Sequence, residues 1–197
     1  MGTVRAPFRF TRIDSMDLVA PMSALGEGNS VSVEAAAKIK GLNGVEFTMS
    51  SSTYFNDDAI SVSQCADTRL VFDTPLKSLN LYNLTDCSVL ACGVSGSIHM
   101  LNCRNVRLLG FCGQLRISSS NDIEVFVQTA SSTALVNSRG IGIGKPLQPV
   151  TDKRISEVLQ HLNLANPEYF DSCRWKNVKD FDYLPQTSRS ENWSFIS

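Results

Sequence analysis

The chain has 197 residues, of which 43% are hydrophobic and 19% are charged, and its formal net charge is −1. This composition is typical of a globular protein and excludes an intrinsically disordered one, and the length suffices for one domain with a sizeable core. The balanced charge excludes a bulk attraction to nucleic acid or to an anionic membrane, and no apolar run approaches the roughly 18 residues of a membrane-spanning helix.

The N-terminal segment, residues 1–30, is mixed in composition, and we expect it to form a loosely packed lead-in. It contains Pro21, Gly26 and Gly28, which favour loops. It lacks the apolar centre of a signal peptide, and Ala6 stands where a myristoylation motif requires Ser or Thr. We therefore expect a cytoplasmic protein without a membrane anchor.

Two interpretations stay open for the next segment, Ser32–Lys40. Glu34–Lys38 has helical propensity. Val31, Val33 and Ile39 alternate with polar residues, as side chains of a strand do.

Residues 31–150 carry a pattern that recurs about every nineteen residues. Each repeat is a short alternating strand, a small or polar corner, and a second short alternating strand. We anchor the repeats on their corner residues, which are 24, 19, 19, 17 and 18 positions apart. These anchors are Asn43, Asp67, Asp86, Asn105, Asp122 and Gly140.

These intervals predict an all-β fold, a parallel β-helix of about six coils over residues 31–150. Helical repeats are longer, at 33 residues or more, and lack the period-2 alternation. Asn, Asp and Gly suit tight corners because they tolerate left-handed backbone. Each coil buries its apolar face by stacking on its neighbours. We interpret Ser50–Asp58, inside the longest interval, as an inserted loop.

Residues 151–197 are predicted to form a C-terminal helix and tail that pack on the β-helix. Apolar residues at i, i+3, i+4 and i+7 from Ile155 indicate an amphipathic helix over residues 152–163. We expect the aromatic residues of the tail to cover the open edge of the last coil. They are Trp175, Phe181, Tyr183, Trp193 and Phe195.

The six cysteines indicate packing rather than metal binding or disulfides. None forms a CxxC motif, and only His99 and His161 are present to assist, so we predict no metal site. Cys65 and Cys103 lie two residues before a corner residue, and Ser120 takes the same position. We therefore expect small side chains stacked inside the corner, as unpaired thiols of a cytosolic protein.

No nucleophile–base–acid arrangement stands out, so we expect neither a stand-alone catalytic site nor a cofactor. Gly140–Gly144 lacks the Lys-Ser/Thr of a phosphate-binding loop, and we interpret it as a glycine-rich last coil.

The remaining candidate is the pair Gln114 and Arg116. Alternation places them together on the outer face, opposite Leu115. Arg104 and Arg107 lie one coil earlier, and we add Arg104 as a candidate partner contact. An ordinary solvated arginine is the alternative interpretation of Arg116.

Four stretches resemble the C-terminal domain of tubulin-binding cofactor C, and the likeness runs from about residue 40 to residue 197. They are Cys112–Arg116, Asn121–Phe126, Asn177–Phe181 and Glu191–Ser194. The resemblance implies a right-handed parallel β-helix that activates an ADP-ribosylation-factor-like small GTPase in its GTP-bound form. It also implies α/β-tubulin and the other tubulin cofactors as partners, no nucleic acid, and an association with the cytoskeleton.

Residue by residue, Arg116 matches the arginine finger of the family and Gln114 the glutamine beside it. A planar, permanently charged guanidinium supplied in trans suits a GTPase with an incomplete site. Phe181, after Asp180, matches an aromatic residue that contacts the GTPase, with packing of the tail as the alternative. Asn137 stands where the family usually has glutamate, so it keeps an acceptor but loses the charge.

Two other classes of function remain. The cyclase-associated protein has a related β-helix that binds actin without an arginine finger, so a non-catalytic cytoskeletal module is the alternative. A carbohydrate-active β-helix enzyme would need carboxylates clustered on one face and a secreted chain.

Overall fold

The computed structural model describes residues 38–49, 59–74, 76–146, 160, 174–183 and 190–197. The predicted lead-in, the loop over Ser50–Asp58 and, apart from Gln160, the helix over residues 152–163 lie outside the described residues. Within the described ranges, no helix has the length and apolar character needed to cross a bilayer.

The described chain consists almost entirely of β-strands, which pair in parallel, and it includes one short 3-10 helix, η1 (Arg174–Lys176). Of the segment Ser32–Lys40, for which helix and strand were both open, the described residues Lys38–Lys40 form a strand. The strands are β1 (Lys38–Lys40), β2 (Glu46–Met49), β3 (Ala59–Ser63), β4 (Arg69–Phe72), β5 (Ser78–Tyr82), β6 (Thr85–Leu101), β7 (Arg104–Ser118), β8 (Asn121–Thr129), β9 (Thr133–Val136), β10 (Arg139–Gly144), β11 (Val178–Asp180) and β12 (Trp193–Ile196).

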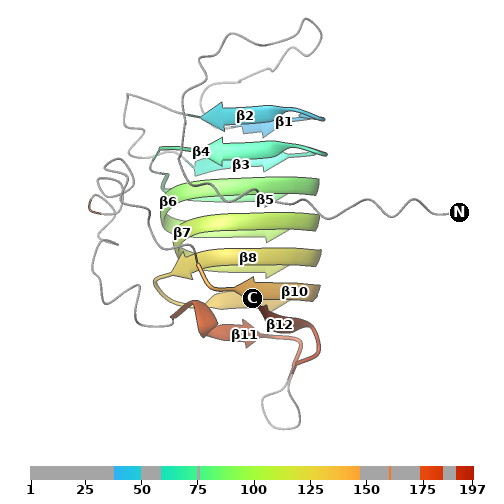
Figure 1. The fold of residues 1–197 in the computed structure, drawn as a ribbon, viewed down its shortest axis with the longest axis vertical. Helices are drawn as coiled ribbons and strands as arrows, with labels where there is room; N and C mark the ends of the chain where they lie inside the picture. Colours follow the sequence, from blue (N-terminus) through green and yellow to red (C-terminus); the bar gives the residue numbers. More distant parts are fainter. Residues whose placement is uncertain (1–37, 50–58, 75, 147–159, 161–173, 184–189) are drawn as a thin grey trace, which may run out of the picture. The chain divides into compact units, whose positions relative to one another are not determined.

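The strands form two stacks (Figure 1). The long strands β6 and β7 bend, so that one half of each strand lies in the first stack and the other half in the second. The first stack consists of β1, β3, β5, residues 98–101 of β6, residues 114–118 of β7, β9 and β11. The second stack consists of β2, β4, residues 85–91 of β6, residues 104–110 of β7, β8, β10 and β12.

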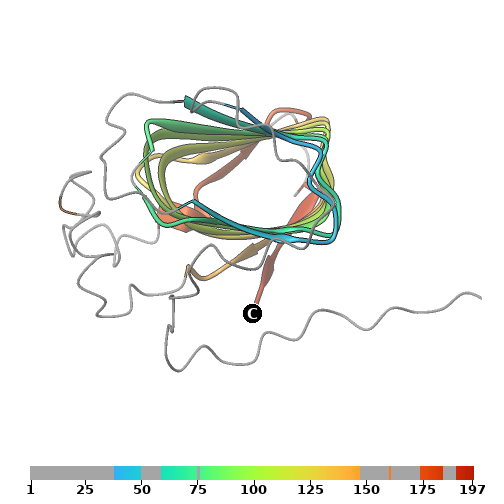
Figure 2. The ribbon, with the colours of Figure 1, turned by 90° about the horizontal axis from the view of Figure 1, so that it is seen from above.

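Seen along the stacking direction, the coils superpose into a flattened ring whose two long sides are these stacks (Figure 2). Each coil supplies one strand to each stack, and the parallel pairs join one coil to the next. This arrangement confirms the predicted parallel β-helix.

The corner between the stacks holds two ladders of residues with left-handed backbone, three positions apart on each coil. The first ladder is Gly41, Gln64, Asn83, Asn102, Ser119 and Asn137. The second is Gly44, Asp67, Asp86, Asn105, Asp122 and Gly140. The predicted corners are thus confirmed from Asp67 onward. The first corner is wrong by one position, because Asn43 is extended and bridges to Ala66, and Gly44 makes the turn.

Side chains stack on both sides of this corner. Inside it, the Ser120 hydroxyl donates to the carbonyl of Ser118 at 2.8 Å and accepts from the Cys103 N–H at 3.1 Å. Outside it, the side-chain amide of Asn102 donates to the Asn83 side-chain oxygen of the preceding coil at 2.6 Å. Small, slightly polar side chains therefore line the inner corner, as predicted, and amide ladders stabilise the outer one.

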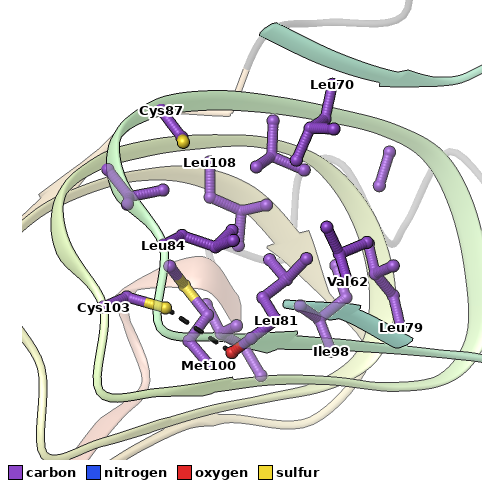
Figure 3. Packing of buried hydrophobic residues seen from close by; sticks show 14 of the residues in the cluster. Val62, Leu70, Leu79, Leu81, Leu84, Cys87, Ile98, Met100, Cys103 and Leu108 are labelled. Carbon is purple, nitrogen blue, oxygen red and sulfur yellow. Dashed lines mark hydrogen bonds between the residues drawn. The ribbon is translucent and has the colours of Figure 1, made fainter. Parts of the chain in front are cut away.

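The interior is a single apolar cluster built from the inward positions of both stacks (Figure 3). Its residues interdigitate between coils, and the Cys103 thiol within it donates to the Leu81 carbonyl at 3.5 Å. The predicted glycine-rich coil contains strand β10, but it is not the last one, because β12 pairs with the far edge of β10. Its Gly144 leaves room for the ring of Phe126 on the preceding coil, which a Cβ atom would overlap.

The described part of the tail completes both stacks, with β11 beside β9 and β12 beside β10. Three aromatic rings meet edge to face at this end, with centroids 5.8 Å apart for Trp175 and Phe195 and 5.2 Å for Trp193 and Phe195. Trp175 and Trp193 pack against the core cluster, so these rings shield the last coil from water. Phe181 differs, because 67% of its surface is exposed.

Candidate functional site

Arg116 lies on the outer face of the first stack, where its backbone is held from both sides. Within β7 it faces His99 of β6 on one side and Ala134 of β9 on the other. Leu115 and Ile117 are fully buried and Arg116 is exposed, which confirms the predicted alternation. A strand paired along both edges is a rigid support for a long side chain.

Gln114 orients the guanidinium of Arg116. Its side-chain oxygen accepts from the Arg116 Nε at 3.1 Å and from Nη2 at 3.0 Å. An arginine carries five N–H donors, so these two bonds fix the plane of the group and leave three donors over. The acceptor is a neutral amide, and within the described ranges no carboxylate forms an ion pair with Arg116. The positive charge is therefore held in place without being neutralised.

The other two arginines considered from sequence lie elsewhere. Arg107 belongs to the second stack, where its Nε donates to the Glu124 carboxylate at 2.5 Å and its Nη2 forms an ion pair with the same oxygen. Arg104 is exposed and sits at the corner, in register with Thr85 of the preceding coil. The structure therefore groups neither residue with Arg116 on the first stack.

The surroundings of Arg116 include side chains that the sequence analysis did not single out. His99 lies on the preceding coil, in register with Arg116, and its ring meets that of Tyr82 edge to face with centroids 6.3 Å apart. Leu101 and Val136, on the coils before and after, are each 37% exposed. Strand alternation marks both as outward positions, but only the register between coils places them beside Arg116.

Asp180 anchors the tail. Its Oδ2 accepts from the Ser190 hydroxyl at 2.5 Å and from the Asn192 side-chain amide at 2.9 Å, and its Oδ1 accepts from the Asp182 N–H at 3.0 Å. The next residue, Phe181, donates its N–H to the carbonyl of Leu135 at 3.0 Å. The phenyl ring thus extends from a fixed position on the last rung of the first stack.

Asn137 occupies a left-handed corner position, with φ of 49°. Its N–H donates to the Asp182 carboxylate at 2.5 Å. Asparagine tolerates this backbone better than most residues do. The amide therefore suits this corner, and Asp182 supplies a carboxylate nearby.

The thiols of Cys103 and Cys112 are not candidates for chemistry. Burial raises the pKa of Cys103 to about 11 and that of Cys112 to about 12, so both are neutral and unreactive near pH 7. Among the residues that the structure describes, no three His, Cys, Asp or Glu side chains gather into a group that could hold a metal ion.

Comparisons with known proteins bear on the family and the fold of the chain. The family model described as tubulin binding cofactor C matches residues 57–181, which include every residue of the site except the end of the tail. The tubulin-specific chaperone C of Mus musculus is 28% identical over 121 residues, a match that covers 60% of this chain and 33% of that protein. Its counterpart from Dictyostelium discoideum is 27% identical over 156 residues, covering 68% of this chain and 36% of that protein.

Among solved structures, tubulin binding cofactor C from Leishmania major superposes with a TM-score of 0.52 and 17% sequence identity. The superposition covers 62% of this chain and 80% of that one, and it shows the shared fold. The chain spans about a third of the length of the curated relatives it matches.

Proposed function

Because the chain belongs to the tubulin binding cofactor C family, we propose that it acts in tubulin folding as a GTPase-activating protein for an ADP-ribosylation-factor-like small GTPase. It has no catalytic site of its own in this proposal and completes the active site of its GTP-bound partner. Tubulin and the other tubulin cofactors are its further partners. Its place of action is the cytoplasm, in association with the cytoskeleton.

The observation that carries this proposal is the unneutralised guanidinium of Arg116, held by Gln114 on a strand paired along both edges. Hydrolysis of GTP builds negative charge on the transferring phosphoryl group and the leaving oxygen. A fixed positive charge stabilises that state without further reorganisation. The three N–H donors of Arg116 that Gln114 does not occupy supply hydrogen bonds to phosphate oxygens.

The remaining candidates surround this finger. Phe181 is exposed and rigidly mounted, which suits a contact with the GTPase, and Asp180 positions it by fixing the tail. Asn137 and Asp182 together offer an amide and a carboxylate at the corner next to Phe181. Arg104 lies further around the coil and contributes at the rim of the contact.

The test is single-turnover GTP hydrolysis by an ADP-ribosylation-factor-like GTPase, with and without tubulin and the other cofactors. We expect wild type to accelerate hydrolysis roughly 10³–10⁵-fold and Arg116→Ala to abolish this acceleration while its circular dichroism stays unchanged. Arg107→Ala is the matched control on the same strand and should activate like wild type. Equal activation by wild type and Arg116→Ala would overturn the proposal.

A non-catalytic cytoskeletal binding module is the second candidate, favoured by the exposed Leu101, Val136 and Phe181. Binding to tubulin or actin that survives in Arg116→Ala, together with no acceleration by wild type, would decide for it.

A further inference from the structure

The exposed apolar side chains of the described residues are concentrated beside Arg116. Four large hydrophobic side chains are exposed, namely Leu101, Val136, Phe181 and Phe195. The first three lie in one column of the first stack, because Leu101 is in register with Ser118, Ser118 with Val136, and Phe181 follows the pair Asp180–Leu135. Single exposed apolar residues are common on protein surfaces, but an aligned set indicates an interface.

Tyr82 extends this column by one rung, since it is in register with Leu101. The column, which we name the apolar column, therefore consists of Tyr82, Leu101, Val136 and Phe181, with Ser118 between Leu101 and Val136. It spans five rungs, or about 19 Å at the usual spacing of about 4.8 Å between strands. Ser118 lies on the rung of Arg116, so the column leaves a gap directly beside the finger.

The charged side chains at outward strand positions of the first stack are all positive. Its outward strand positions carry Lys38, Lys40, Arg116 and Lys179 and no carboxylate, because Asp180 of β11 is in register with the buried Leu135. On the second stack, by contrast, two ion pairs join neighbouring coils, Glu46 with Arg69 and Arg107 with Glu124. The face of Arg116 therefore complements an anionic surface and repels a cationic one.

We infer that the apolar column docks the partner by packing against apolar side chains beside its bound nucleotide, while Arg116 reaches the phosphates. This inference rests on the proposed function and assigns its docking residues. Aromatic residues and arginine are enriched among the residues that carry most of the binding energy of an interface, which favours Tyr82, Phe181 and Arg116 as the centre of this one. The column sets the affinity for the partner, and Arg116 sets the rate of hydrolysis.

The experiment uses the full chain and an ADP-ribosylation-factor-like GTPase loaded with a non-hydrolysable GTP analogue, and it measures the Kd by calorimetry. We expect Leu101→Asp and Val136→Asp each to raise the Kd at least tenfold, with hydrolysis in the saturated complex unchanged. Arg116→Ala should show the opposite split, with a Kd within a few-fold of wild type and lost hydrolysis. Ser88→Asp, at an outward position of the second stack, is the control and should bind like wild type.

Leu101→Ser and Val136→Ser are second variants that should fold normally, because serine already occupies this column at Ser63 and Ser118. They should raise the Kd less than the Asp variants do and unfold like wild type. Wild-type affinity in both Asp variants, with acceleration by wild type intact, would overturn the inference and leave the proposed function standing. If wild type binds the GTPase without accelerating hydrolysis, and the Asp variants lose this binding, the docking role of the apolar column is supported and the arginine-finger role of Arg116 is overturned. Absence of both binding and acceleration by wild type would overturn both.

Discussion

Strand β7 carries three arginines, and two of them, Arg107 and Arg116, lie in different halves and have different partners. Residues 104–110 belong to the second stack and residues 114–118 to the first, and each half buries one leucine completely, Leu108 in the one and Leu115 in the other. Arg107 is neutralised by Glu124, whereas among the described residues the side-chain partner of Arg116 is the neutral amide oxygen of Gln114. Since both halves meet the same packing requirement, the β-helix does not need an unpaired charge. A charge left without an ion pair is what the proposed arginine finger requires.

The largest expected effect is a loss of stability on truncating a leucine in the interior that both stacks share. Leu108→Ala and Leu115→Ala should each lower the free energy of unfolding by about 2–5 kcal/mol, because each removes a fully buried side chain from a packed coil. Chemical denaturation of the two variants measures this, and the two losses should agree within a factor of two. A near-native Leu115→Ala would show that the first stack is loosely packed, and the rigid platform for Arg116 would be lost.

A second change makes the two arginines alike. Gln114→Glu places a carboxylate where the amide oxygen now accepts from Arg116, so the finger becomes an ion pair like that of Arg107 and Glu124. We expect GTPase activation to fall about tenfold, which corresponds to roughly 1.4 kcal/mol of transition-state stabilisation.

Single-turnover hydrolysis measures this loss, and Glu124→Gln is its converse control. Releasing Arg107 from its carboxylate should give no gain in activation, because Arg107 lies on the other stack. Full activation by Gln114→Glu would mean that the charge state of Arg116 is unimportant.

The smallest expected effect concerns the pH dependence of stability and two buried thiols, Cys103 immediately before β7 and Cys112 within it. Burial raises the pKa of Cys103 from near 9 to about 11 and that of Cys112 to about 12, so the folded protein keeps protons that the unfolded chain releases. Their stabilising contribution is complete below about pH 9 and is lost as the pH rises toward 11–12. At pH 10 each thiol should lower the free energy of unfolding by about 1 kcal/mol relative to pH 7.

Cys103→Ser isolates one of the two thiols, since Ser120 and Ser138 occupy the same corner position on later coils. Denaturation between pH 7 and pH 10 should show a shallower loss of stability in this variant. Identical pH profiles for wild type and variant would contradict the assignment.

Sequence alone predicted the parallel β-helix because corner chemistry and alternation repeat together along the chain. It missed the first ladder of corner residues, since Gln64 and Ser119 adopt left-handed backbone without being typical turn residues. It also misplaced the first corner, where Asn43 has the expected chemistry but the adjacent Gly44 makes the turn at lower cost.

The site was predictable where it depends on one strand and not where it depends on several. Gln114 and Arg116 are two positions apart, so alternation alone puts them together. The neighbourhood of His99, Leu101 and Val136 depends on the register between coils, which varies with intervals of 17–19 residues and cannot be counted from one strand. The bonds from Asp180 to Ser190 and Asn192 join residues within the tail, where no repeat exists to guide a prediction.

The parallel ladders also fix distances that sequence separation hides. Arg116 and Phe181 lie far apart along the chain, yet they stand only two rungs apart on the first stack, because β11 pairs with β9 and β9 with β7. Two rungs amount to about 10 Å. Insertions or deletions between β10 and β11 can therefore lengthen or shorten the chain without changing this spacing. The length of that connection can therefore differ between related chains. The spacing that a partner must match is set by the hydrogen bonds between the strands and stays the same.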